Sequence, residues 1–179
     1  RDWHRAGVDI PVAVNIFPPS LAALQLPDRL ERALSERGLD CSALTVEITE
    51  DALLDDIATT RQVLTELRDS GIRVAIDDFG SGYSALWYLR DLPVDEVKLD
   101  RSFIAPIAVD PRAAAVAQAV IDLAHVLLMT TVAEGVENLD TADWLRRHGC
   151  DIVQGYYFSP PLSAIEVLSL SAPTAVKSS

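Results

Sequence analysis

Residues 73–78 read RVAIDD, an apolar run that ends in two adjacent carboxylates, Asp77 and Asp78. Apolar and β-branched residues in a short run are typical of a buried strand, whereas paired aspartates at its end are not. Two neighbouring carboxylates repel one another unless a cation lies between them. The stretch therefore predicts a buried strand that delivers two acidic side chains to a functional site.

Five other runs repeat this arrangement along the chain. Each is apolar and ends in polar residues that a buried strand does not usually carry. The runs are VAVN (12–15), TVEITE (45–50), EVKLD (96–100), TVAEGVE (131–137) and DIVQG (151–155). Amphipathic segments separate them, which predicts a parallel sheet covered by helices. Polar residues at the carboxyl ends of successive strands are typical of the active site of a (β/α) barrel.

The length limits how much of a barrel the chain can hold. A complete eight-stranded barrel takes about 250 residues, and the chain has 179. We therefore expect an α/β fold of the TIM-barrel type, incomplete, with about six of the eight β/α units. The expected strands span residues 12–16, 44–49, 73–76, 96–99, 130–133 and 152–154. We expect one domain over residues 1–170 and a disordered tail over 171–179.

Helix signals between these strands predict several boundaries. Residues 18–20 (PPS) predict the start of a helix that ends at Gly38. Residues 110–111 (DP) predict another start, because proline fits the first helical position. That helix is expected to bury Val116, Val120, Ile121, Leu123 and Ala124. Asp140 is the expected cap of a later helix, which Gly149 closes.

Charge and hydropathy exclude several classes of function. The net charge is −12 and the isoelectric point is near 4.5, so long nucleic acid and anionic membranes are poor partners. No run of 18 apolar residues predicts a transmembrane helix, and the first residues do not resemble a signal peptide. We expect a cytoplasmic domain without membrane insertion, and an anionic ligand would need metal ions to bridge it.

Cysteine and histidine give no sign of a zinc site. Cys41 and Cys150 lie far apart without metal-ligand spacing, and we expect both to be buried thiols in a reducing compartment. His4, His125 and His148 lie on helical segments or at their ends, which argues against zinc chemistry.

Oxygen donors at the strand ends predict a different kind of metal site. Glu47, Asp77 and Asp78, together with the amide of Asn15, suit Mg²⁺ or Mn²⁺. Two alternatives stay open at this point. Asp78 alone could cap the following turn, and Asn15 alone is more often a turn residue. Six strands with two open edges also predict a dimer or a strand-swapped form.

Other polar residues are candidates for the same site. Lys98 lies in an apolar strand, so it must point into the barrel mouth or pair with a carboxylate, and a purely structural ion pair is the alternative. Glu134 has small neighbours that leave room for a ligand. Glu137 could be a site residue or a helix-start charge, and Tyr156 could stack on a base or pack the barrel rim. The glycines at 80 and 82 resemble a phosphate-binding loop only weakly, because the lysine and spacing of a P-loop are missing.

The motifs EITE, DDFGSGYS, LPVDEVKLDRSF, VAEGVE and GCDIVQGYYFS occur in this order along the chain. Their order resembles the EAL-type phosphodiesterases of bacterial cyclic di-GMP signalling, from about Trp3 to Leu162. The resemblance implies a (β/α) barrel that hydrolyses cyclic di-GMP to linear pGpG with two Mg²⁺ or Mn²⁺ ions. It also implies a homodimer, with a sensor or GGDEF-type domain possible upstream.

The resemblance assigns roles to individual residues. The matches to metal ligands are Asn15, Glu47, Asp77 and Asp78. Lys98 matches a catalytic lysine that orients the attacking water. Glu134 matches an acidic residue that supports the second metal and its waters. Gln154 matches a glutamine that holds the residues and waters around this metal. Glu50 matches the residue that anchors the loop 78–84. Glu137 and Tyr156 are expected near the substrate.

The chain departs from the family pattern in three places. The family carries a Glu-x-Leu motif on its first strand, followed by an arginine that contacts substrate, and none of the strands expected here carries such a segment. Phe17 stands where the family usually has a small polar residue, and Pro160 stands where a basic residue is common. The alternative function is therefore a catalytically inactive module that acts as a cyclic di-GMP receptor or a protein-interaction domain. Carboxylates and a lysine around Mg²⁺ could also serve proton abstraction in an enolase-like barrel, but the motif order disfavours this.

Overall fold

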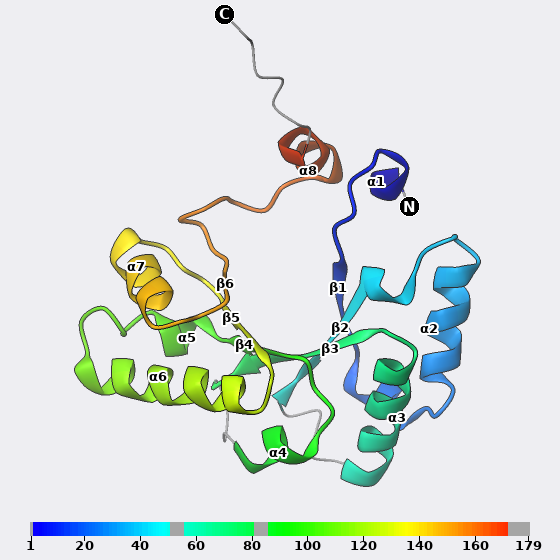
Figure 1. Cartoon of the computed structure of the whole chain (residues 1–179), viewed down its shortest axis with the longest axis horizontal. Helices are drawn as coiled ribbons and strands as arrows, with labels where there is room; N and C mark the ends of the chain where they lie inside the picture. The colour runs from blue at the N-terminus through cyan, green and yellow to red at the C-terminus, as the bar shows by residue number, and fades with distance from the viewer. Residues whose placement is uncertain (1, 51–55, 81–85, 172–179) are drawn as a thin grey trace, which may run out of the picture.

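The computed structural model of the chain describes residues 2–50, 56–80 and 86–171. Six strands form one parallel sheet in which each strand pairs with the next along the chain. The strands are β1 (Val12–Asn15), β2 (Leu44–Thr49), β3 (Arg73–Phe79), β4 (Glu96–Leu99), β5 (Thr130–Ala133) and β6 (Ile152–Val153). Figure 1 shows this sheet curled into an incomplete barrel with helices along its outer side. The predicted α/β barrel fold with about six units is confirmed.

The helices lie between the strands as the alternation predicts. They are α1 (Asp2–Arg5), α2 (Leu26–Ser35), α3 (Ile57–Asp69), α4 (Leu86–Asp91), α5 (Arg101–Ile104), α6 (Pro111–Val126), α7 (Leu139–Arg147) and α8 (Ala164–Ser171), with 3₁₀ turns at Pro18–Ala22 and Cys41–Ala43. The indole N–H of Trp3 donates to the Ala164 carbonyl at 2.9 Å. This bond joins α1 to α8 at the open side of the sheet (Figure 1). Apart from Ser171, the expected tail lies outside the described residues.

Three helix predictions were wrong in detail. The single helix expected from residue 18 to Gly38 is divided into a 3₁₀ turn and α2, because Pro27 lies in the first turn of α2 and a proline there starts a helix anew. Val116 is 53% exposed and Leu123 is only half-buried, because the buried stripe of α6 consists of Ala117, Val120, Ile121 and Ala124. The cap of α7 is Asn138, whose side chain accepts the Thr141 N–H, rather than Asp140.

Alternation along the strands separates the core from the site. Side chains of successive strand residues point to opposite faces of a sheet. The face toward the helices carries apolar residues of the core, among them Val46, Ile48, Val74, Ile76, Val97 and Leu99. The other face of the central strands carries charge, with Glu47, Glu96 and Lys98 all buried. The inside of the curl is therefore polar, and the apolar core lies between sheet and helices.

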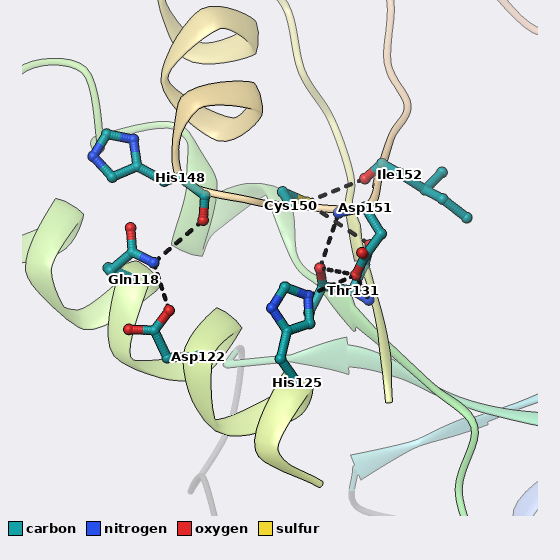
Figure 2. A network of polar contacts seen from close by, with 8 residues as sticks. All are labelled: Gln118, Asp122, His125, Thr131, His148, Cys150, Asp151 and Ile152. Atoms are coloured by element: carbon teal, nitrogen blue, oxygen red, sulfur yellow. Dashed lines mark hydrogen bonds and ion pairs between the residues drawn. The ribbon is translucent and has the colours of Figure 1, made fainter. Parts of the chain in front are cut away.

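A polar network fixes β6 against β5 at the amino ends of the strands. The Asp151 carboxylate accepts hydrogen bonds from the backbone N–H and the hydroxyl of Thr131 at 2.8 and 2.7 Å, and lies 2.9 Å from His125 Nε2 (Figure 2). Partial burial opposes the charge of Asp151, but these bonds outweigh it and lower its pKa. Gln118 donates to the His148 carbonyl, which joins α6 to the end of α7. The network fixes the position of β6 relative to β5, and with it the position of Gln154 at the carboxyl end of β6.

Leu128 has an unfavourable backbone conformation, and glycine there is expected to stabilise the fold. Its φ is +62° in the residue after the α6 cap, where the Leu128 and Met129 N–H groups bond the His125 and Ala124 carbonyls. This is the Schellman pattern, in which glycine is preferred. Because Leu128 is 92% exposed, little buried surface is lost. We expect Leu128→Gly to raise the free energy of unfolding by about 1 kcal/mol in urea titrations.

The matched control is Leu127→Gly, because Leu127 has φ −85° and packs partly against the core. This variant is expected to be less stable than the wild-type chain. A destabilised Leu128→Gly variant would show that the conformation at Leu128 carries no strain.

Candidate active site

Lys98 is the centre of a buried cluster of carboxylates at the carboxyl ends of the strands. Its ammonium lies 2.6 Å from Glu47 Oε1, 2.9 Å from Asp77 Oδ1 and 2.7 Å from Glu134 Oε1. The side chains of Lys98 and Glu47 are 9% and 10% exposed. One lysine from β4 therefore gathers acidic groups from β2, from β3 and from the residue that follows β5.

A bulge places both aspartates of the DD pair on this side of the sheet. In a regular strand Asp77 and Asp78 would point to opposite faces. The pairing of β3 with β4 shifts between Ile76 and Phe79, and Asp78 has φ +55°. Bulges of this kind redirect a side chain and are frequent beside active sites. Here the bulge lets two consecutive carboxylates meet at one place.

The resulting acidic cluster fits a divalent cation. One oxygen each from Asp77, Asp78 and Glu134 can be chosen so that all three lie within 4.8 Å of one another. Carboxylate oxygens at such spacing suit hard cations such as Mg²⁺ and Mn²⁺. Among the described residues, no other group of three acidic, histidine or cysteine side chains has the spacing needed to bind a metal ion.

The protonation of the cluster reflects this crowding. Burial alone would lower the pKa of Lys98, but hydrogen bonds to three carboxylates outweigh it and raise the pKa. Burial raises the pKa of Glu134, which Lys98 partly opposes. Asp78 is exposed overall, but partial desolvation and the charge of Asp77 raise its pKa. Lys98 therefore keeps its charge, while the charged forms of Glu134 and Asp78 are made less favourable, an effect that a bound cation would oppose.

Gln154 and Tyr156 extend the site beyond the carboxylates. The Gln154 amide donates to Glu134 Oε1 at 2.6 Å and so fixes the Glu134 carboxylate. Both residues line a hollow of about 390 Å³, together with Tyr156 and Pro160. Tyr156 is 66% exposed, so its ring is open to a ligand rather than packed into the rim.

The remaining predicted residues lie at different places around this centre. Asn15 is paired with Glu47 in the register of β1 and β2, at the exposed edge of the sheet. Glu50 is buried, and its carboxylate accepts the Gly80 N–H at 3.4 Å, at the start of the glycine-containing loop. Residues 81–85 of that loop lie outside the described residues. Glu137 forms a half-exposed ion pair with Arg101 at 2.9 Å.

Sequence reasoning missed a second charged layer beneath Lys98. Glu96 lies two residues before Lys98 on β4, so both point to the inside of the curl. Its carboxylate is 3.1 Å from Arg73 Nη2 at the start of β3. Burial raises the pKa of Glu96, and the charges of Arg73 and Lys98 oppose this shift. The signal was present in the sequence, since Glu96 and Lys98 are both charged and two positions apart in an apolar strand.

Neutralising Asp78 is expected to stabilise the metal-free chain. Because the folded-state pKa of Asp78 is raised, the native state binds more protons, and its stability falls as pH rises from the unfolded pKa toward the folded one. Asp78→Asn removes this loss and keeps a residue tolerated at positive φ. We expect a gain of roughly half a kcal/mol at pH 7, since Asp78 is exposed and its charge is screened.

Urea unfolding with a chelator present measures this gain at two pH values. Near pH 3.5 or below, most of the Asp78 carboxyls are protonated in both states, so the two proteins should be nearly equal in stability. A stability difference that is the same at low pH and at pH 7 would show that the charge of Asp78 is not its cause.

Comparison with known proteins defines the class. Residues 1–161 match the EAL domain family. The chain is 45% identical over 163 residues to cyclic di-GMP phosphodiesterase NbdA of Pseudomonas aeruginosa, covering 90% of this chain and 21% of that protein. The chain belongs to the EAL domain family. It spans about a fifth to a quarter of the length of the curated relatives it matches.

Solved structures show the same fold. The EAL domain of Mycobacterium smegmatis DcpA superposes with a TM-score of 0.89 at 40% identity, covering 94% of this chain and 77% of that one. The manganese and cyclic di-GMP complex of Klebsiella pneumoniae BlrP1 superposes with a TM-score of 0.80 at 33% identity, covering 89% of this chain and 41% of that one.

Proposed function

We propose that the chain is the C-terminal part of a phosphodiesterase domain that hydrolyses cyclic di-GMP to linear pGpG with two Mg²⁺ or Mn²⁺ ions. The observation that carries the proposal is the convergence of Asp77, Asp78 and Glu134 beside Lys98. Asp77 and Asp78 would hold the ions with Glu47 and Asn15. When bound, such ions activate water and stabilise charge on the phosphoryl oxygens.

The other residues of the site would bind and orient the reactants. Water adds to one phosphorus, the bond from phosphorus to the 3′-oxygen breaks, and the product keeps a 5′-phosphate. The three N–H groups of the Lys98 ammonium bond carboxylates in the metal-free chain. One of them would turn to the attacking water once a carboxylate partner binds an ion. Gln154 donates to Glu134, which would support the second ion, and Tyr156 would stack on a guanine of the substrate. Glu50 would hold the loop that starts at Gly80.

Glu137 is the weakest of the proposed site residues. Its carboxylate is paired with Arg101, and the Arg101 side chain lies against Gly135, where an added Cβ would be 2.6 Å from the Arg101 Cβ. This pair would support the backbone next to Glu134. A contribution of Glu137 to the substrate site would act through that backbone.

The assay is hydrolysis of cyclic di-GMP by the purified chain, with pGpG followed by chromatography. We expect turnover with Mn²⁺ or Mg²⁺ and none with a chelator. If a folded chain bound cyclic di-GMP without cleaving it, the proposed phosphodiesterase would be wrong and the receptor alternative would hold.

We also propose a cytoplasmic homodimer that works with a sensor or GGDEF-type domain in the same protein. Among the described residues no helix is both long and apolar enough to cross a membrane. The edge strand β1 exposes Val12 and Val14 at 45% each, which supports a protein partner. The greater length of the relatives supports additional domains. Light scattering tests the dimer, and a monomer with cooperative unfolding would contradict it.

A further inference from the structure

Lys98 shares its partners with the acidic cluster. Two of the three cluster residues, Asp77 and Glu134, each accept a short contact from the Lys98 ammonium, at 2.9 and 2.7 Å. A cation held by these two carboxylates would therefore lie close to the ammonium. Lys98 and a divalent ion would therefore compete for the same two carboxylates.

Burial strengthens the electrostatic competition between Lys98 and a divalent ion for the same carboxylates. The side chains of Lys98, Glu47 and Asp77 are 9%, 10% and 13% exposed. Little water lies around them to screen either attraction or repulsion. Without Lys98, the buried carboxylates would repel one another, and removing one partner of a buried ion pair is strongly destabilising.

We propose that Lys98 is an internal counter-ion: it holds Glu47, Asp77 and Glu134 together in the metal-free chain and opposes the binding of divalent ions. Lys98 thereby limits metal affinity in addition to any role toward water. The inference rests on the metal site of the proposed function. It predicts two effects of opposite sign when the charge is removed.

The variant that tests it is Lys98→Met, which keeps the length of the side chain and loses the charge. We expect a lower melting temperature in chelator and about tenfold tighter Mn²⁺ binding in calorimetry, from the loss of a cation a few ångströms away. Lys98→Arg keeps the charge and should bind Mn²⁺ within a few-fold of wild type. Arg68→Met removes a charge paired with Asp95 away from the site and should leave the affinity unchanged.

The wild-type chain provides a second measurement that does not depend on a variant. Lys98 and Lys177 are its two lysines, so lysine-selective ¹⁵N NMR gives two side-chain signals. Saturating Mg²⁺ should shift the Lys98 signal, because its carboxylate partners are then shared with the ion.

The outcomes separate this inference from the proposed function. A wild-type chain that binds no Mn²⁺ overturns the metal site and the inference with it. Mn²⁺ binding that is unchanged or weaker in Lys98→Met overturns the inference alone. If Lys98→Met does not fold, a Lys98 signal that stays in place at saturating Mg²⁺ overturns it.

Discussion

Asp77→Asn is expected to reduce cyclic di-GMP hydrolysis by roughly a thousandfold, because several kcal/mol of charge stabilisation are lost and each 1.4 kcal/mol is about tenfold in rate. Asp77 contacts Lys98 and belongs to the acidic cluster, so its charge acts on both. Asparagine has nearly the same shape and removes only that charge. The measurement is the rate of pGpG formation at saturating Mn²⁺.

The control for Asp77→Asn is Asp143→Asn. Asp143 lies on α7, is half-exposed and pairs with Arg146. Its replacement should leave the rate unchanged. A circular dichroism spectrum like that of the wild type would show that Asp77→Asn is folded. If this folded variant kept its activity, Asp77 could not be a metal ligand.

Gly155→Ala is expected to destabilise the fold by about 3 kcal/mol, at the upper end for overpacking. A Cβ at Gly155 would lie 2.2 Å from the Val136 carbonyl oxygen and 2.3 Å from its nitrogen. The obstacle is backbone, which is bonded on both sides to Gln154 and Tyr157. Moving it would also disturb the Gln154 contact with Glu134, so activity should fall with stability.

Gly38→Ala separates this collision from the general cost of replacing glycine. Gly38 has φ +65°, and a Cβ there would meet nothing within 4 Å. Only the conformational cost of about 1 kcal/mol applies. Urea unfolding of both variants gives the comparison. Equal losses of stability would mean that the contact with Val136 relaxes without cost.

Most of the fold could be predicted because local pattern and tertiary structure agree. Every predicted strand exists, and its polar end lies where parallel strands bring such ends together. The largest difference is at β3, which was expected to end at residue 76 and extends to Phe79. Pairing resumes at Phe79 after the bulge. The two-residue alternation of apolar and polar side chains could not predict this bulge, because an extra residue interrupts the alternation.

The sequence singles out the residues that meet around Lys98, but it could not predict their contacts. The triple contact of Lys98 depends on the order of strands and on their relative shift, which no local window contains. The Arg73–Glu96 pair was missed for the same reason. Val116 was wrongly placed in the core because several stripes of an apolar helix look alike until the helix is packed.

The most direct test of the metal site is a Mn²⁺ titration of the chain followed by electron paramagnetic resonance, which reports the free ion. The account predicts saturable binding of two Mn²⁺ that Asp77→Asn largely abolishes. If all added Mn²⁺ stayed free, or if Asp77→Asn bound it as wild type does, the cluster of Asp77, Asp78 and Glu134 would not be a metal site.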